Sequence, residues 1–237
     1  MGLIAIVKEN VELDVADGTR MSAYVSRPKQ GGPYPGLLLF QEAFGVNRHI
    51  RNVSNRFALE GCVVIAPELF HRTAPAGFEG SYTDFPAVLP HLQAVTTETA
   101  EADIRSAYDW LRVNPQVKPD QISSVGFCMG GRVSFIANSI VPLRAAVSFY
   151  GGGIAPELLD RAANLQAPSL FIWGGLDKHI TPELRRAVTE ALSSKQKIYV
   201  NAEFSRADHG FFCDERAAYE PHSARQAWSL TSEFLRS

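Results

Sequence analysis

Short apolar runs that alternate with amphipathic segments constrain the fold more than any other feature of this sequence. The runs at 36–45, 62–69 and 169–175 are apolar at successive positions instead of at every second one. Strands that are apolar on both faces belong inside a parallel sheet, because helices then cover both sides of that sheet. The pattern therefore predicts an α/β fold with a mostly parallel central sheet and helices on both faces, a three-layer sandwich.

The alternation continues to the end of the chain. Residues 9–28 are expected to form two short strands around an Asp17-Gly18 turn, which is a hairpin signal. Further strands are expected at 122–127, 143–150 and 197–204, and helices at 49–61, 98–114, 129–139, 156–165, 182–192 and 223–237. Because no repeat or linker interrupts them, we predict a single domain over residues 1–237. The stretch 71–93, rich in Gly, Pro and aromatic residues, is either a lid over an active site or a long surface connection.

The composition excludes several classes of partner. The formal net charge is −2 with basic and acidic residues interspersed, which predicts neither nucleic-acid binding nor attraction to an anionic membrane. The N-terminus lacks the basic start and the cleavage site of a signal peptide, and no apolar stretch approaches the roughly 20 residues that span a bilayer. We therefore expect a soluble, cytoplasmic protein that binds a small molecule. No exposed apolar stripe stands out, so we expect a monomer.

The cysteines and glycines predict no metal site and no nucleotide cofactor. Cys62, Cys128 and Cys213 are odd in number and widely separated, which argues against a disulfide framework and a zinc site. We expect three free thiols, with Cys62 and Cys213 as structural residues. The Gly-rich segments match neither the dinucleotide-binding pattern nor the P-loop pattern.

One cysteine stands in a motif that carries chemistry. Gly126-Phe127-Cys128-Met129-Gly130 matches the G-x-nucleophile-x-G turn between a strand and a helix. Such a turn forces the central residue into strained backbone angles and leaves no room for a Cβ two positions away on either side. The helix N-terminus behind it favours a thiolate and an oxyanion. Cys128 is therefore the candidate nucleophile, although a buried structural cysteine is the alternative interpretation.

Two later loops supply candidate partners for this thiol. In α/β-hydrolases the order along the chain is nucleophile, acid, histidine, with the acid and the histidine each following a late strand. Asp177 follows the apolar run 169–175, and His209 follows the next expected strand. An imidazole can accept the thiol proton and return it to a leaving group, while a buried carboxylate orients the imidazole. Asp208 and Asp214 are weaker candidates for the acid, and His179 is expected to be a surface loop residue unless it approaches the site.

Four motifs in order resemble the dienelactone hydrolase family, whose members have an α/β-hydrolase fold and a cysteine nucleophile. The motifs are QEAFGVN, GFCMGG, WGGLDKHITP and ADHGFF. The resemblance implies that Glu42, in the first motif, hydrogen-bonds the resting thiol and helps to remove its proton. It also implies an oxyanion hole formed by the backbone N–H groups of Met129 and Ala43.

The sequence departs from the family where substrate is held. Members that open dienelactone bind its carboxylate with two arginines, yet Cys213 stands at one expected position and residues 79–98 contain no arginine or lysine. Arg72, Arg206 and Arg216 are the candidate substitutes. Beside these loops, Phe44 and Phe211 are expected to contact substrate.

Thiol chemistry narrows the substrate. A thiolate leaves a tetrahedral intermediate more easily than an alkoxide does, so a cysteine enzyme needs an ester with a good leaving group. We expect an activated lactone or an enol or aryl ester, opened through a thioester on Cys128. A thioesterase or acyl-transfer enzyme with the same triad is one alternative. A redox-sensing binding protein on a hydrolase fold is another.

Overall fold

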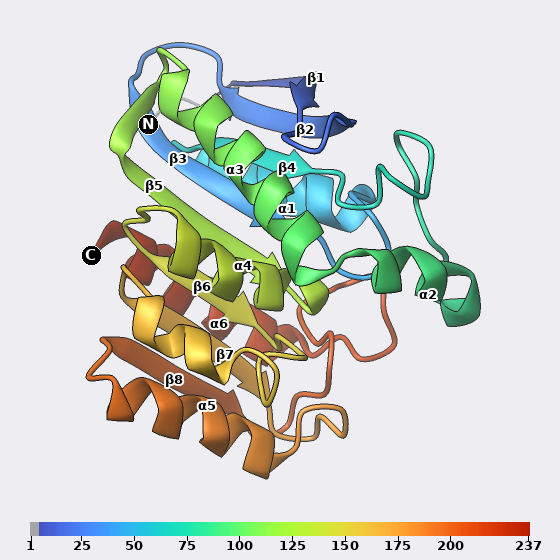
Figure 1. The fold of residues 1–237 in the computed structure, drawn as a ribbon, viewed down its shortest axis with the longest axis vertical. Helices are drawn as coiled ribbons and strands as arrows, with labels where there is room; N and C mark the ends of the chain where they lie inside the picture. Colours follow the sequence, from blue (N-terminus) through green and yellow to red (C-terminus); the bar gives the residue numbers. More distant parts are fainter. Residues whose placement is uncertain (1–4) are drawn as a thin grey trace. The chain divides into compact units, whose positions relative to one another are not determined.

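The computed structural model describes residues 5–237, which fall into two compact units divided between Ser123 and Ser124. Both units are built from strands alternating with helices, as Figure 1 shows. The prediction of a single domain stays a prediction.

The first unit contains a hairpin, two further strands and three helices. Its strands are β1 (Ile6–Asp14), β2 (Arg20–Pro28), β3 (Tyr34–Phe40) and β4 (Val63–Pro67), and its helices are α1 (Arg48–Leu59), α2 (Phe85–Ala94) and α3 (Thr97–Val113). The strand order is β1-β2-β4-β3, in which only β3 and β4 pair in parallel. The expected hairpin is confirmed, because β1 pairs with β2 around Gly18, whose φ of 86° suits glycine.

The second unit is the parallel half of the fold. The strand β5 (Val117–Phe127) ends in this unit and pairs in parallel with β6 (Ala146–Phe149), followed in order by β7 (Ser169–Gly174) and β8 (Tyr199–Phe204). Its helices are α4 (Met129–Ile140), α5 (Pro182–Ser194) and α6 (Pro221–Arg236), with the short helix η1 (Leu159–Asn164). Helix α6 lies behind the strands and α4 and α5 lie in front of them (Figure 1). The described residues thus form eight mostly parallel strands with helices, which confirms the α/β class.

The helices begin where short polar side chains cap them. Asn47, Thr96 and Thr181 each accept a hydrogen bond from the backbone N–H three residues later, at the starts of α1, α3 and α5. These caps satisfy donors that a helix leaves without intrahelical acceptors. These three helices therefore begin within a few residues of their predicted starts.

Two segments differ from the sequence prediction. The segment 156–165 was expected to be an α-helix, but it forms the 3₁₀ helix η1, which lacks a side-chain N-cap. The stretch 71–93 contains helix α2, which Asp84 caps and which tolerates Pro86 in its first turn and Pro90 inside it. The sequence did not predict this helix, because proline is unfavourable inside helices and the segment contains two. Val88 of α2 packs against Phe44 in a small hydrophobic cluster, whereas a role of this segment as a lid stays a prediction.

Among the residues that the structure describes, no helix has both the length and the apolar character that crossing a bilayer requires.

Candidate active site

Cys128 is the single residue between strand β5 and helix α4, and its backbone is strained. Its φ is 55° and its ψ is −117°, a conformation that side chains other than glycine rarely adopt. A Cβ at Gly126 would overlap the carbonyl oxygen of Gly130, so only glycine fits two residues before the cysteine. The Cys128 N–H donates to the carbonyl oxygen of Phe149 at 3.0 Å, and the Cys128 carbonyl accepts from the N–H of Gly131 at 2.9 Å. Neighbouring strands and the helix start therefore hold the strained residue in place.

A chain of polar contacts joins the thiol to an imidazole and a carboxylate. His209 Nε2 lies 3.1 Å from the Cys128 Sγ, and His209 Nδ1 lies 2.8 Å from Asp177 Oδ2. Asp177 follows β7 and His209 follows β8, so the ends of neighbouring parallel strands bring the two together. The side chain of Asp177 is 1% exposed and that of His209 is 13% exposed. Protein atoms thus surround the carboxylate, while the imidazole keeps some access to solvent.

Backbone donors hold the carboxylate in position. Asp177 Oδ1 accepts hydrogen bonds from the N–H groups of His179 at 2.8 Å and Ile180 at 3.1 Å. Its other oxygen is thereby left for the imidazole. Two N–H donors on one side and an imidazole on the other allow Asp177 to stay ionised although it is buried.

The electrostatics favour a protonated imidazole. Burial by itself would lower the pKa of His209, but the hydrogen bond to Asp177 and the contact with the Cys128 sulfur outweigh burial and raise that pKa to about 10. Burial would raise the pKa of Asp177, yet the hydrogen bonds from His209 and from the backbone hold that pKa below its ordinary value. At neutral pH the proton is therefore on His209, whose positive ring faces the sulfur.

Two aromatic rings lie beside the imidazole of His209, and the sequence pointed to only one of them, His179. The ring of Tyr150 lies 5.1 Å from that of His209, and the ring of His179 lies 5.5 Å from it, edge-on at 80°. His179 is exposed, as predicted, but it also contacts the candidate base. Its position beside Asp177 in sequence was a signal for this contact, whereas nothing local pointed to Tyr150.

Asp208, a weaker candidate for the acid, contacts the backbone of His209. The Asp208 Oδ1 accepts from the backbone N–H of His209 at 2.7 Å, which caps the turn. Asp208 and Asp214 are both exposed.

The residues expected to prime the thiol lie in the first unit. Glu42 and Ala43 follow strand β3 and are 0% and 1% exposed. The side-chain amide of Gln41 donates to the Glu42 carbonyl at 3.3 Å, and its oxygen accepts from the N–H of Leu69 at 3.1 Å. Gln41 thus fixes the backbone of this loop. The roles of Glu42 and of the Ala43 and Met129 N–H groups stay predictions; Met129 is the first residue of α4, where N–H groups lack intrahelical acceptors.

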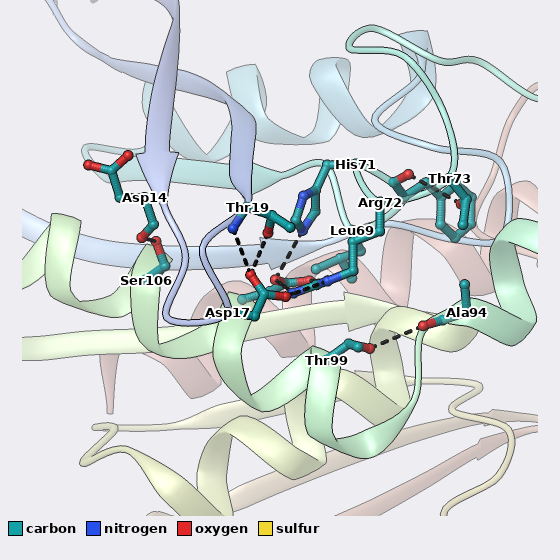
Figure 2. A network of polar contacts seen from close by, with 12 residues as sticks. Asp14, Asp17, Thr19, Leu69, His71, Arg72, Thr73, Ala94, Thr99 and Ser106 are labelled. Carbon is teal, nitrogen blue, oxygen red and sulfur yellow. Dashed lines mark hydrogen bonds and ion pairs between the residues drawn. The ribbon is translucent and has the colours of Figure 1, made fainter.

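Arg72 is engaged in a polar network of the first unit (Figure 2). Its Nε donates to Asp17 Oδ2 at 2.7 Å, and its Nη1 and Nη2 donate to the two oxygens of Asp103 at 2.9 and 2.8 Å. His71 Nε2 lies 3.1 Å from the same Asp103. The guanidinium therefore binds two carboxylates of its own unit. Arg72 is therefore not part of the substrate site that we propose.

Three of the remaining candidate contacts, Arg206, Phe211 and Arg216, belong to the loop that carries His209 or to the residues next to it. Arg206 is exposed. A cavity of about 450 Å³ in this region is lined by Glu203, Phe204, Ser205, Arg206, Glu220, His222, Ser223 and Gln226. Phe211 is fully buried, and the guanidinium of Arg216 packs against Gly210 where any Cβ would collide with it. Phe44 belongs to the cluster with Val88 in the first unit.

The three cysteines are free thiols, as expected. Cys213 is buried and Cys62 is half-buried.

The fold and this arrangement define a class of protein. Strands alternate with helices, a strained cysteine occupies a strand-to-helix turn, and Asp and His follow later strands. These features are typical of α/β-hydrolases. With the family match given next, they define a hydrolase that acts on esters or lactones. The family model described as the dienelactone hydrolase family matches residues 21–237. The chain belongs to the dienelactone hydrolase family.

Individual relatives agree with this assignment. A Synechocystis protein provisionally named carboxymethylenebutenolidase is 32% identical over 98% of this chain and 95% of its own length. An Escherichia coli O157:H7 protein with the same provisional name is 35% identical over 93% of this chain and 84% of its own length. The crystal structure of a provisionally identified dienelactone hydrolase from Klebsiella pneumoniae has a TM-score of 0.88 at 29% identity and covers 98% of this chain and 99% of that one. The expected fold and family are confirmed.

Proposed function

We propose that the protein opens an activated lactone, or cleaves an enol or aryl ester, through a thioester on Cys128. The observation that carries this proposal is the continuous contact from Asp177 through His209 to the Cys128 sulfur, at 2.8 and 3.1 Å. A strained nucleophile above a helix start, a positive imidazole and a buried carboxylate are the parts that acyl transfer needs. We propose that the protein's partner is the small-molecule substrate. We also propose that the protein is a monomer and that it acts in the cytoplasm.

The first half-reaction forms the thioester. The Cys128 sulfur, as thiolate, attacks the acyl carbon, and the carbonyl oxygen becomes an oxyanion that the N–H groups of Met129 and Ala43 would stabilise. When the intermediate collapses, the acyl C–O bond breaks and the leaving oxygen takes the proton from His209 Nε2. Asp177 stays ionised throughout and keeps the imidazole oriented through Nδ1.

The second half-reaction restores the enzyme. Water attacks the thioester carbon while the now neutral His209 Nε2 takes one of its protons. Collapse of this intermediate breaks the C–S bond, releases the carboxylic acid and returns the imidazolium beside a thiolate. As the family resemblance implies, the resting sulfur would be a thiol hydrogen-bonded to Glu42, which takes the thiol proton when substrate binds and returns it to the thiolate after turnover.

The leaving group decides which esters react. An enolate or a phenolate competes with a thiolate for expulsion, whereas an alkoxide does not, so an alkyl ester returns to the reactants. The relatives named carboxymethylenebutenolidase point to a butenolide with an enol leaving oxygen. We propose the same substrate class here, with the exact compound open.

A direct test compares a carboxymethylene butenolide with an uncharged aryl ester. Cys128→Ala should abolish the hydrolysis of both, while the matched control Cys62→Ala should leave the hydrolysis of both near the wild-type rate. Hydrolysis of the aryl ester alone would keep the thioester mechanism and exclude the butenolide as substrate. Equal turnover by wild type and Cys128→Ala would overturn the mechanism. Inactivity of the wild type towards both substrates would instead favour a redox-sensing thiol.

A further inference from the structure

Tyr150 is a buried aromatic residue in a strained backbone conformation directly after strand β6. Its φ is 37°, which lies in the left-handed region, and its side chain is 0% exposed. A bulky residue at positive φ persists only where its surroundings fix it, and such residues cluster at functional sites. In the second unit, Cys128 at the elbow and Gln196 in a turn after α5 are the other described residues of this kind besides glycine.

Backbone hydrogen bonds connect Tyr150 to the elbow and to the next strand. Its N–H donates to the carbonyl oxygen of Ile172 in β7 at 2.7 Å. The preceding residue, Phe149, accepts the N–H of Cys128 at 3.0 Å. The segment that carries the Tyr150 ring is therefore fixed on one side to the nucleophile and on the other to the strand that leads to Asp177.

The ring itself packs against the imidazole of His209. The ring centroids are 5.1 Å apart and the planes make an angle of 56°. The ring of Phe211, which is also fully buried, lies 5.6 Å from that of Tyr150. An aromatic ring at this distance attracts an imidazolium through its π electrons. Close packing of this kind also limits how far a side chain can turn, and the imidazole must point one nitrogen at each of two partners.

We propose that Tyr150 is a positioning residue, whose ring holds the His209 imidazole so that Nε2 faces the Cys128 sulfur while Nδ1 faces Asp177. This inference rests on the proposed function, because it assigns Tyr150 to the geometry of that triad. The aromatic ring performs this role and not the hydroxyl group, so phenylalanine should replace tyrosine without large loss.

The test compares Tyr150→Leu with Tyr150→Phe, with Phe135→Leu as the matched control. Phe135 is a buried aromatic residue of helix α4 that contacts Phe171 at 6.3 Å, so its change to leucine also removes a buried ring. For Tyr150→Leu, kcat on the aryl ester should fall roughly 10- to 100-fold with KM nearly unchanged, since misplacing a catalytic group has effects of this size. Tyr150→Phe and Phe135→Leu should stay within about threefold of the wild type.

A second readout does not depend on turnover. Iodoacetamide alkylation of Cys128, followed by mass spectrometry of its peptide, reports how the imidazolium acts on the sulfur. Tyr150→Leu should slow alkylation near neutral pH more than at alkaline pH, where any free thiol is ionised. If Tyr150→Leu does not fold by circular dichroism, Phe211→Leu removes the ring beside Tyr150 and should produce a smaller effect of the same kind.

Three results separate the possible failures. Wild-type kcat and alkylation in Tyr150→Leu would overturn the positioning role. An equal loss in Tyr150→Phe would assign the effect to the hydroxyl group and would also overturn it. Full activity of Cys128→Ala would instead overturn the proposed function, whatever Tyr150 does.

Discussion

Each unit of the protein contains a buried pair of histidine and aspartate, and the two pairs differ in what surrounds them. In the first unit, His71 Nε2 lies 3.1 Å from Asp103, and the two side chains are 4% and 0% exposed. In the second unit, His209 Nδ1 lies 2.8 Å from Asp177, and the side chains are 13% and 1% exposed. By distance and burial alone the pairs are nearly equivalent.

Their other contacts separate them. Asp103 is neutralised by two hydrogen bonds from Arg72, and the second nitrogen of His71 is buried with no hydrogen-bond partner among the described residues. Asp177 is held by backbone N–H groups, which carry no full charge, and the second nitrogen of His209 reaches the thiol. A histidine–aspartate pair can therefore serve catalysis only where the free nitrogen faces a nucleophile and no cation competes for the carboxylate.

The largest expected effect comes from the two histidines. His209→Gln removes the group that exchanges protons with the leaving oxygen and with water, so kcat should fall roughly 10⁴-fold. His71→Gln should leave kcat within about threefold of the wild type, because its pair faces no nucleophile. Steady-state hydrolysis of the aryl ester measures both. A comparable loss of kcat in the two variants would remove the distinction between the pairs.

Asp177 should likewise be needed for activity and Asp103 should not, and the pH profile should show the difference. Burial lowers the pKa of His209, but the hydrogen bond to Asp177 and the contact with the Cys128 sulfur together raise it to about 10, so wild-type activity should persist at neutral pH and fall only as the pH rises through about 10. Asp177→Asn removes the contribution of Asp177 and leaves that of Cys128, so the alkaline limb should move down from about 10 in the direction of 6.5, the ordinary pKa of a histidine, and kcat should fall about 10³- to 10⁴-fold. Profiles of kcat/KM against pH test this. Asp103→Asn should leave the position of the limb unchanged, and a shift there would contradict the comparison.

For stability we expect the larger effect in the first unit, where the polar network of Arg72 lies. Arg72→Ala leaves the fully buried Asp103 without its cation, and removing one partner of a buried ion pair costs about 3 to 5 kcal/mol of the free energy of unfolding. Urea denaturation measures that free energy, and Arg206→Ala, at an exposed position, is the control that should change it by less than about 0.5 kcal/mol. A loss as small as that of the control would mean that the network in Figure 2 contributes no stability.

The smallest effect is expected at the rim of the same network. The Thr19 side chain and backbone N–H both donate to Asp17, and these hydrogen bonds hold the pKa of Asp17 below its ordinary range. Thr19→Val keeps the backbone donor and loses only the hydroxyl, so the free energy of unfolding should fall by about 0.5 kcal/mol. Urea denaturation of the single variant is the measurement. A loss as large as that of Arg72→Ala would show that the network depends on its exposed end.

Local sequence carried enough information for the fold class and for the order of strands and helices, although several strand ends differ from the predicted ones. Apolar runs fixed the strand positions, and Cys128, Asp177 and His209 followed from a turn motif and from their order after strands. The structure brings these three side chains together, and their catalytic roles stay predictions. The segment 156–165 was misread because its apolar spacing does not distinguish a 3₁₀ turn from an α-helix.

The contacts that sequence could not predict are those between distant segments. The bond between Arg72 and Asp103 spans 31 residues, so the arginine seemed available for substrate. Tyr150 has a φ of 37° and donates its backbone N–H to Ile172 of the neighbouring strand β7, and its residue type alone predicts neither feature. Such features depend on how strands pair, and a pattern of single residues does not contain that information.

The central claim is that Cys128 carries the acyl group, and rapid acid quench followed by intact mass spectrometry tests it most directly. The wild type, mixed with an excess of an aryl ester and quenched during the first turnover, should gain the mass of one acyl group. Peptide mapping should place that group on Cys128, and Cys128→Ala should show neither the adduct nor turnover. An acyl group on any other residue, or turnover by Cys128→Ala at the wild-type rate, would contradict the claim.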